Sequence, residues 1–350
     1  MFRTILSLLL ALICTSLSHA QWPDQTPPDE VPVFLPTDYD PKVPSPLVIF
    51  LHGWAPISPI WYDILVPIQD DANDHGYIFT KPVGSQDVFG DYYWNATDAC
   101  CDIFNSNPEH VSYIIALVDS IKENYNVDPQ RIHLIGQSNG GFMCHRMACE
   151  APEVFASVVS LTGAMWNDES NCQPSEPIHV LHIHGTLDPI IFWLGGFLGP
   201  KLVPYPGAST TAAHWATHNG CTTDATNAGS FNFDDFIWFP DAETTRWVYE
   251  QCDEPSAGSS ELWEVFGGSH FPVISTEGTN MIFDYMDTHT KPVPTCNADV
   301  NGDDQVNVAD VLYVIGAWKS SDPNADINND GVVNVADLLE VISGWGPCQP

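Results

Sequence analysis

Basic residues are scarce in this sequence. Ten lysines and arginines face 45 aspartates and glutamates, so the formal net charge is -35. A chain this acidic repels phosphate backbones, which excludes nucleic acid as a partner and disfavours polyanionic substrates. The acids do not form one tail, because residues 21–295 hold 36 of them and residues 296–350 hold 9. This spread favours an adaptation to solubility or high salt over a binding device.

Long hydrophobic runs are also missing after residue 20, so no membrane span is expected there. Before that point Arg3 provides a basic start, residues 5–13 form an apolar stretch too short to cross a bilayer, and small residues precede Gln21. These features are typical of a secretory signal peptide. We therefore predict a signal peptide over residues 1–20 and a secreted, extracellular protein.

Export makes the cysteines informative, because disulfides persist outside the cytoplasm. Nine of the ten cysteines follow the predicted signal peptide, and an odd number leaves at least one unpaired. The preferred bridges join Cys221 to Cys252 and Cys296 to Cys348, with Cys149 to Cys172 as a further candidate.

Short apolar runs bounded by glycine recur in the first 290 residues. They are PLVIFLHG (46–53), RIHLIG (131–136), ASVVSLTG (156–163) and IHVLHIHG (178–185). Between two of them, residues 109–126 space apolar side chains by three and four, which predicts an amphipathic helix. Strands that alternate with helices predict an α/β fold, with a mostly parallel sheet and helices on both faces. Ligands of such sheets bind at the carboxyl ends of the strands.

The chain changes character at TKPVPTC (290–296), a short segment that contains two prolines. Beyond it, residues 298–318 and 325–345 match almost residue for residue at a period of 27, so they are two copies of one unit. We predict a first domain over 21–290, a linker over 291–296 and a small all-α repeat domain over 297–350.

A GxSxG pattern follows the second of the apolar runs. Gly136, Ser138 and Gly140 form it within LIGQSNGGF (134–142). In α/β-hydrolases this pattern is the sharp strand-to-helix turn that exposes a nucleophilic serine. The pattern is weak evidence alone, so the rest of the chain must supply the partners of that serine.

The two partners expected in an α/β-hydrolase are an acid and then a histidine, each after a later strand. Asp188 and His270 meet both requirements. The imidazole would take the proton of Ser138 as its oxygen attacks an acyl carbon, and the carboxylate would fix the tautomer and stabilise the imidazolium. His182 and His184 are nearer to Asp188 in sequence, but their alternation on a buried strand favours core or supporting positions.

Such chemistry also needs backbone N–H groups that hold the developing oxyanion. The N–H of Asn139, directly after the serine, is one candidate, and that of Trp54 in LHGWA (51–55) is the other. His52 is expected to shape this loop rather than to transfer a proton. No cofactor is expected for catalysis.

These motifs lie in stretches that resemble secreted α/β-hydrolases of the polyhydroxybutyrate depolymerase and feruloyl esterase type, over roughly residues 30–290. The stretches are LHGW (51–54), WNATDACCD (94–102), VDPQRIHLIGQSNGGFMCHRMACEAPEVFASVVSLTGA (127–164), HIHGTLDPI (182–190), YPGASTTAAHWATHNGC (205–221) and GGSHFP (267–272). The resemblance implies that Ser138, His270 and Asp188 cleave carboxylic esters, either of hydroxyalkanoate polyesters or of feruloylated plant polysaccharide.

Substrate contacts are less determined. Trp54, Trp94 and Trp193 could stack on an aromatic acyl group or a polymer chain, although core packing explains them equally well. After the histidine the family commonly has threonine and tryptophan, whereas this chain has Phe271 and Pro272. This departure touches the expected acyl pocket and leaves the choice of ester open.

The repeat domain carries two twelve-residue loops with oxygen ligands at alternating positions, as in calcium-binding loops. The first loop offers Asp299, Asn301, Asp303, Gln305 through its carbonyl, and Asp310; the second offers Asp326, Asn328, Asp330, Val332 through its carbonyl, and Asp337. Position 6 of the second loop is Gly331, which permits the sharp turn, whereas the first has Asp304, which predicts strain and a weaker site.

With the duplicated VNVAD, these loops resemble a dockerin, the calcium-folded docking module of secreted polysaccharide-degrading enzymes, over 297–348. The resemblance implies two structural calcium ions and a cohesin-like or cell-surface partner. Dockerins often carry hydroxyl side chains at loop positions 10 and 11. This chain has valine and alanine there in both loops, at 308–309 and 335–336, so a conventional cohesin partner stays open.

We therefore predict a secreted serine carboxylic ester hydrolase that acts on a polymeric ester and is targeted by a calcium-dependent tail. One alternative is a surface-binding or adhesion protein with an inactive hydrolase domain, which the survival of every expected site residue disfavours. A serine peptidase is the other, because the triad does not specify its leaving group.

Overall fold

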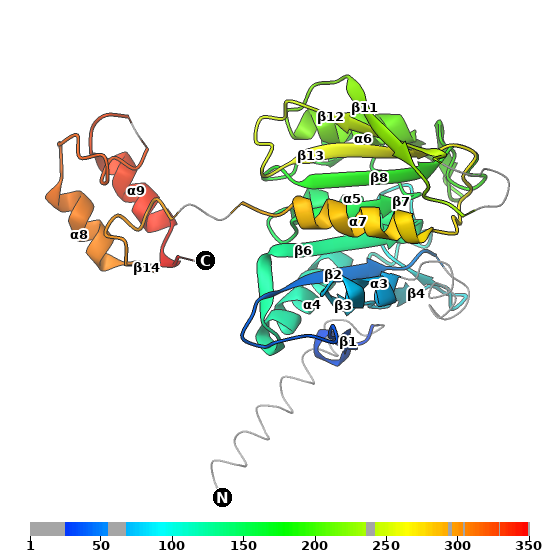
Figure 1. Cartoon of the computed structure of the whole chain (residues 1–350), viewed down its shortest axis with the longest axis horizontal. Coiled ribbons are helices and arrows are strands. Elements are labelled where there is room, and N and C mark those ends of the chain that lie inside the picture. The colour runs from blue at the N-terminus through cyan, green and yellow to red at the C-terminus, as the bar shows by residue number, and fades with distance from the viewer. Residues whose placement is uncertain are drawn as a thin grey trace, which may run out of the picture. The chain divides into compact units, whose positions relative to one another are not determined.

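The computed structural model describes residues 25–54, 68–235, 242–292, 296–303, 305–328 and 330–348. It divides into two units, Met1–Lys291 and Pro292–Pro350, which we describe separately (Figure 1). The predicted signal peptide over 1–20 lies outside the described residues.

A nine-stranded sheet forms the centre of the first unit, in the order β1-β3-β2-β6-β7-β8-β13-β12-β11. Its strands are β1 (Val33–Phe34), β2 (Ser45–Leu51), β3 (Ile78–Thr80), β6 (Val127–Gln137), β7 (Ser157–Leu161), β8 (His179–Gly185), β11 (Ala225–Phe231), β12 (Thr244–Tyr249) and β13 (Ser259–Val265). The neighbours from β3 to β13 pair in parallel, whereas β1, β12 and β11 join by antiparallel pairing. The predicted, mostly parallel sheet is confirmed.

Helices cover both faces of this sheet (Figure 1). On one face, α4 (His110–Asn124), α5 (Asn139–Glu150) and α6 (Ala208–His218) share a core with side chains of β2 and β6. On the other, α3 (Ile68–Asp74) and α7 (Thr276–Thr288) share a core with β7, β8 and β13. Every residue of β2 and β8 is buried, which explains why these strands are apolar runs without alternation.

Smaller elements complete the first unit. They are the 3-10 turns η1 (Pro28–Glu30) and η3 (Glu169–Asn171), and the antiparallel pairs β4 (Ser85–Gln86) with β5 (Tyr92–Tyr93) and β9 (Gly195–Leu198) with β10 (Val203–Pro206). Within the described ranges, we find no helix long and apolar enough to cross a membrane.

Four disulfide bonds link the described cysteines. Three are the predicted ones, Cys149–Cys172, Cys221–Cys252 and Cys296–Cys348. The fourth joins the neighbours Cys100 and Cys101, a pairing that the sequence analysis does not anticipate. Cys144 is free and buried against the sheet, which accounts for the odd number.

In the part of the second unit that the structure describes there are two helices, α8 (Val308–Gly316) and α9 (Val335–Ser343). Each begins with an asparagine cap and an aspartate three residues later that bonds back to the cap, so the two repeats start their helices in the same way. A short strand pair, β14 (Gln305–Val306) with β15 (Gly346–Pro347), adds to the predicted all-α architecture. The hydrophobic core of the second unit consists of Val306, Val314, Ala325, Ile327, Val333 and Val341.

Candidate active site

Ser138 lies at the turn between β6 and α5. Its φ of 54° and ψ of -118° are rare for any residue but glycine, so this turn is strained. The flanking glycines are required by packing rather than by their own dihedrals. A Cβ on Gly136 would lie 2.2 Å from the carbonyl oxygen of Gly140, and one on Gly140 would lie 2.0 Å from that of Leu51. The GxSxG spacing therefore lets α5 begin directly against the ends of β6 and β2.

This packing gives a prediction for Gly140→Ala. The added methyl group would meet the backbone oxygens of Leu51 and His52, which cannot rotate away as a side chain could. We expect the first unit to lose about 1–3 kcal/mol of unfolding free energy, the usual range for overpacking. Urea denaturation measures this loss. Gly316→Ala, at a glycine of the second unit where a Cβ meets nothing within 4 Å, should leave the first unit's stability unchanged. Unchanged stability of the first unit in Gly140→Ala would contradict the predicted clash.

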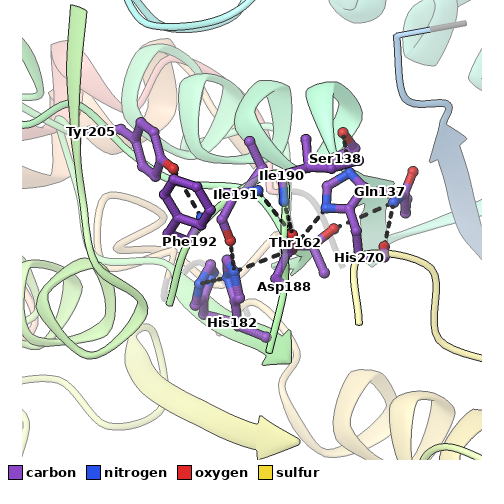
Figure 2. Close-up of polar contacts among 11 residues, drawn as sticks. Gln137, Ser138, Thr162, His182, Asp188, Ile190, Ile191, Phe192, Tyr205 and His270 are labelled. Carbon is purple, nitrogen blue, oxygen red and sulfur yellow. Dashed lines mark hydrogen bonds and ion pairs between the residues drawn. The ribbon is translucent and has the colours of Figure 1, made fainter. Parts of the chain in front are cut away.

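The structure brings Ser138, His270 and Asp188 together. His270 Nε2 lies 2.9 Å from Ser138 Oγ, and His270 Nδ1 lies 2.7 Å from Asp188 Oδ2 (Figure 2). The three residues follow β6, β13 and β8, whose parallel pairing places their carboxyl ends at one edge of the sheet. Asp188 is 4% exposed and His270 is 2% exposed, so little water competes for their hydrogen bond.

Backbone and side-chain groups fix this pair from both sides. Asp188 Oδ1 accepts hydrogen bonds from the N–H groups of Ile190 and Ile191, at 2.8 and 2.9 Å, which leaves Oδ2 to face His270. Gln137 Nε2 donates to the carbonyl oxygen of His270 at 3.0 Å and thereby ties the histidine loop to the residue before Ser138. Sequence reasoning missed Gln137, because it occupies a variable position of the motif.

Asn139 links the start of α5 to the loop that contains Trp94. Its side-chain oxygen accepts from the N–H of Trp94 at 2.6 Å, and its amide nitrogen donates to the carbonyl of Trp94 at 2.9 Å. The backbone N–H of Asn139 is in the first turn of α5, where helical N–H groups lack intrahelical partners. Trp54 is exposed, just past the end of β2. The oxyanion roles of Asn139 and Trp54 stay predictions.

His52 is a structural link in the same loop. Its Nε2 accepts a hydrogen bond from the N–H of Gly84 at 3.0 Å, so its Nδ1 carries the proton and donates to the carbonyl of Gly53 at 2.7 Å. Burial lowers the pKa of His52 to about 4, which keeps the imidazole neutral at pH 7. Both ring nitrogens are thus engaged in holding backbone, as the sequence analysis expects.

The predicted aromatic contacts Trp94, Trp193 and Phe271 differ in their surroundings. Trp94 is 0% exposed and its indole N–H donates to the carbonyl of His52, so the prediction that it touches substrate is wrong. Trp193 is half-buried, with its ring 6.0 Å from that of His184. Phe271 is 48% exposed and its ring centroid lies 4.8 Å from that of His270, which places an accessible apolar surface beside the imidazole.

In the second unit, carboxylates of the first loop converge. Oxygen atoms of Asp299, Asp303 and Asp310 all lie within 4.8 Å of one another, and Asp310 is fully buried. Asp299 Oδ1 also accepts from the N–H groups of Gly302 and Asp303, at 2.8 and 3.1 Å, so the loop curls around this carboxylate. Several carboxylate oxygens in one curled loop are the ligand set that calcium prefers.

The second loop is built in the same way. Asp337 Oδ1 accepts from the N–H groups of Ile327 and Asn328, and Asp326 accepts from those of Asp330 and Gly331. Gly331 has a φ of 93°, the left-handed conformation that its loop position predicts. Asp304, the equivalent residue of the first loop, lies outside the described residues, so the weaker first site stays a prediction.

Comparison with known proteins matches each unit to a family. Residues 28–189 match the family described as "Putative esterase", and residues 297–344 match the dockerin type I domain. The first unit is thus similar to this esterase family and the second to dockerin modules, and we name the two units the esterase-family domain and the dockerin module after these similarities. It is 27% identical to feruloyl esterase B of Piromyces equi over 199 residues, which are 55% of this chain and 36% of that protein. It is 29% identical to feruloyl esterase C of Emericella nidulans over 199 residues, which are 53% of this chain and 60% of that protein.

A further relative of the esterase-family domain is named for a different activity. The bifunctional acetylxylan esterase/xylanase XynS20E of Neocallimastix patriciarum is 23% identical over 171 residues, which are 48% of this chain and 23% of that protein. The chain therefore spans less than two thirds of the length of each of these relatives. The family match ends at residue 189, so it includes Ser138 and Asp188 and stops before His270.

Proposed function

We propose that the esterase-family domain hydrolyses carboxylic esters, with Ser138 as nucleophile, His270 as general base and Asp188 as the residue that orients the histidine. The observation that carries the proposal is the hydrogen-bonded order of the three side chains, at 2.9 and 2.7 Å, on a strained turn at the carboxyl edge of the sheet. The family match and the feruloyl esterase relatives support the same chemistry.

In the first half of the proposed reaction, Ser138 Oγ attacks the ester carbonyl carbon as its proton passes to His270 Nε2. The backbone N–H groups of Asn139 and Trp54 receive the oxyanion. When the tetrahedral intermediate collapses, the bond to the alcohol oxygen breaks and His270 gives its proton to that oxygen, which leaves an acyl group on Ser138. Water then repeats the sequence: His270 takes its proton, the hydroxide oxygen bonds to the acyl carbon, and the proton returns to Ser138 as the acid departs.

Exposed apolar side chains are next to this acid and base along the chain. Leu187, Ile190 and Phe192 flank Asp188 along the chain, and Phe271 follows His270. A surface of this kind favours an aromatic or aliphatic acyl group over a charged one. Together with the names of the feruloyl esterase relatives, this apolar surface favours feruloyl esters of polysaccharide as substrates. Hydroxyalkanoate polyester is the second candidate, because its methyl-bearing chain suits the same surface.

The test of the activity uses the full chain on three substrates. We expect hydrolysis of a short-chain nitrophenyl ester, release of ferulate from feruloylated arabinoxylan and little cleavage of casein. Release of hydroxybutyrate from a polyhydroxybutyrate film in place of ferulate would move the substrate to polyesters. Cleavage of casein without ester hydrolysis would favour the peptidase alternative, and inactivity on all three would favour the binding protein.

We also propose that the dockerin module binds two calcium ions and targets the secreted enzyme to a cohesin-like or cell-surface partner. The converging carboxylates of the first loop and the matching second loop support the calcium proposal. When bound, calcium would neutralise these carboxylates and hold each loop against its helix. Equivalent apolar residues of the two repeats, Val308 with Val335 and Leu312 with Leu339, are exposed, so a partner of this module would offer an apolar surface.

Chelation is expected to lower the stability of the dockerin module. Free calcium at about 100 times the dissociation constant contributes about 2.7 kcal/mol per site, and this contribution disappears in EGTA. Calorimetry of the full chain in calcium and in EGTA would show the module's transition move while that of the esterase-family domain stays. Asp299→Asn, which keeps an acceptor oxygen but loses the charge, should reduce the shift. An unchanged transition in EGTA would argue against calcium.

A further inference from the structure

A line of buried histidines runs behind Asp188, outside the groups that the proposed mechanism uses. His145 belongs to α5, and His182 and His184 belong to β8. Their side chains are 0%, 0% and 1% exposed. His145 Nε2 lies 3.3 Å from His182 Nδ1, and His182 Nε2 lies 3.2 Å from His184 Nδ1, so each ring is hydrogen-bonded to the next.

The two ends of this line have fixed hydrogen-bonding roles. At one end, Trp215 Nε1 of α6 lies 2.9 Å from His145 Nδ1, and an indole N–H can only donate. At the other end, His184 Nε2 lies 2.7 Å from the carbonyl oxygen of Ile191, which can only accept. The indole donor and the carbonyl acceptor therefore fix the direction in which each hydrogen bond between the histidines is donated.

Each histidine in the line is neutral and so has one N–H donor and one acceptor. Burial lowers the pKa of His145 to about 3, and burial also lowers the pKa values of His182 and His184. Because Trp215 donates to Nδ1 of His145, the proton of His145 is on Nε2 and is donated to His182. The same argument puts the proton of His182, and then that of His184, on Nε2. The N–H of His184 is therefore donated to the carbonyl oxygen of Ile191. Every ring nitrogen of the three histidines then has a hydrogen-bond partner.

The end of the line touches the acid of the candidate triad. Ile191, whose carbonyl accepts from His184, donates its own N–H to Asp188 Oδ1 at 2.9 Å. His184 Nε2 also lies 3.5 Å from Asp188 Oδ2, the oxygen that faces His270. His184 thus anchors the short turn whose N–H groups hold the carboxylate, and it directs a further N–H dipole toward that carboxylate.

We propose that Trp215, His145, His182 and His184 form a one-way hydrogen-bond relay that positions Asp188 for catalysis. This relay rests on the proposed function, because it acts through Asp188 and His270. Its members are positioning residues, since they are buried and do not reach the reacting atoms. Apolar side chains would fill the same volume without the cost of burying six ring nitrogens, and a buried polar network that is fully satisfied specifies one arrangement of the groups at its end.

The direction of the relay is tested by the tautomers. In full-length protein labelled with ¹⁵N-histidine, two-bond nitrogen–proton spectra at neutral pH should show His145, His182 and His184 protonated at Nε2 and unprotonated at Nδ1. Assignment follows from the signal lost in each His→Gln variant. A proton on Nδ1 of any of the three would overturn the proposal. This readout needs no substrate, so it is independent of whether the esterase proposal holds.

The positioning role is tested by paired substitutions of His184. His184→Gln keeps one acceptor and one donor, whereas His184→Leu keeps neither. We expect His184→Leu to lower kcat for a nitrophenyl ester about 10–100-fold with little change in KM, as losses of supporting partners usually do. His184→Gln should restore most of the rate.

His133→Leu is the matched control, because His133 is equally buried but bonds to Ser157 Oγ, on a different part of the sheet. It should lower stability and leave kcat unchanged. Equal kcat for His184→Leu and the unmodified chain would overturn the positioning role, and so would equal losses in His184→Gln and His184→Leu. If His184→Leu fails to fold, Trp215→Phe decides, since it removes only the indole donor: unchanged tautomers and an unchanged kcat would contradict the relay. Absence of any Ser138-dependent hydrolysis in the unmodified chain would instead refute the proposed function.

Discussion

Replacing Ser138 with alanine is expected to lower kcat for a nitrophenyl ester by about 10⁵ to 10⁶-fold. The alanine side chain cannot form the acyl intermediate, and the proton acceptor His270 Nε2, now 2.9 Å from the serine oxygen, loses its donor. Binding should change little, because the proposed oxyanion donors, at Asn139 and Trp54, are backbone groups. Steady-state kinetics gives kcat and KM separately, and the acyl-enzyme of the native chain should be trapped by a fluorophosphonate probe that fails to label the variant.

Ser160→Ala is the matched control for this prediction. Ser160 is buried on β7, and its hydroxyl has no hydrogen-bond partner among the described residues, so its loss should be neutral for rate and for stability. Asp188→Asn should fall between the two, with a loss of about 10⁴-fold, because an amide favours the wrong tautomer of His270. Equal rates for the native chain and Ser138→Ala would remove the esterase proposal.

Acid is expected to unfold the first unit well before its carboxylates are protonated. Five buried histidines have pKa values lowered by burial, to about 4 for His52 and to about 3 for His110, His133, His145 and His179. In the unfolded chain a histidine has a pKa of about 6.5, so as the pH falls below that value the unfolded state takes up protons first. Stability is therefore full above about pH 6.5 and declines toward the folded values near 3 to 4.

The size of this effect follows from the same linkage. At pH 5 each such histidine costs about 2 kcal/mol, and the five together cost about 10 kcal/mol, which is comparable with the whole stability of a typical domain. Thermal melts of the full chain at pH 7.5 and pH 5, followed by circular dichroism at constant salt, should show a large fall for the first unit. Residues 297–350 contain no histidine, so the transition of the dockerin module is an internal control. An identical melting temperature of the first unit at both pH values would contradict the burial of neutral imidazoles.

The triad could be predicted because its signal is local at each residue. Ser138 has the glycine spacing, and Asp188 and His270 each follow a buried strand, whose apolar run without alternation marks it in the sequence. Parallel pairing of the strands then brings the three residues together, since it places the carboxyl ends of β6, β8 and β13 at one edge of the sheet. The disulfide Cys296–Cys348 was accessible for a similar reason, because its two cysteines flank the repeat domain that the sequence delimits.

What the sequence could not supply depends on contacts between distant elements. A tryptophan in a sequence can belong to a binding surface or to a core. For Trp94, only the packing of its loop on Asn139 and His52 shows that it belongs to the core. The relay depends on the packing of α5, β8 and α6 against one another. The spacing of His145 and His182 along the chain therefore does not predict it. In α4, the periodicity includes Val111 and Ile115, which are only partly buried, whereas the sheet covers a slightly rotated face with Tyr113 and Leu117.

The Cys296–Cys348 bond restricts the conformations that the unfolded dockerin module can adopt. By joining two cysteines that are 52 positions apart, it lowers the conformational entropy of the denatured chain by an amount worth about 4 kcal/mol. Without the calcium ions that we propose, the module would still be a closed covalent loop with few alternative topologies. If the module binds calcium as proposed, return of the ions would therefore start from a state close to the native fold.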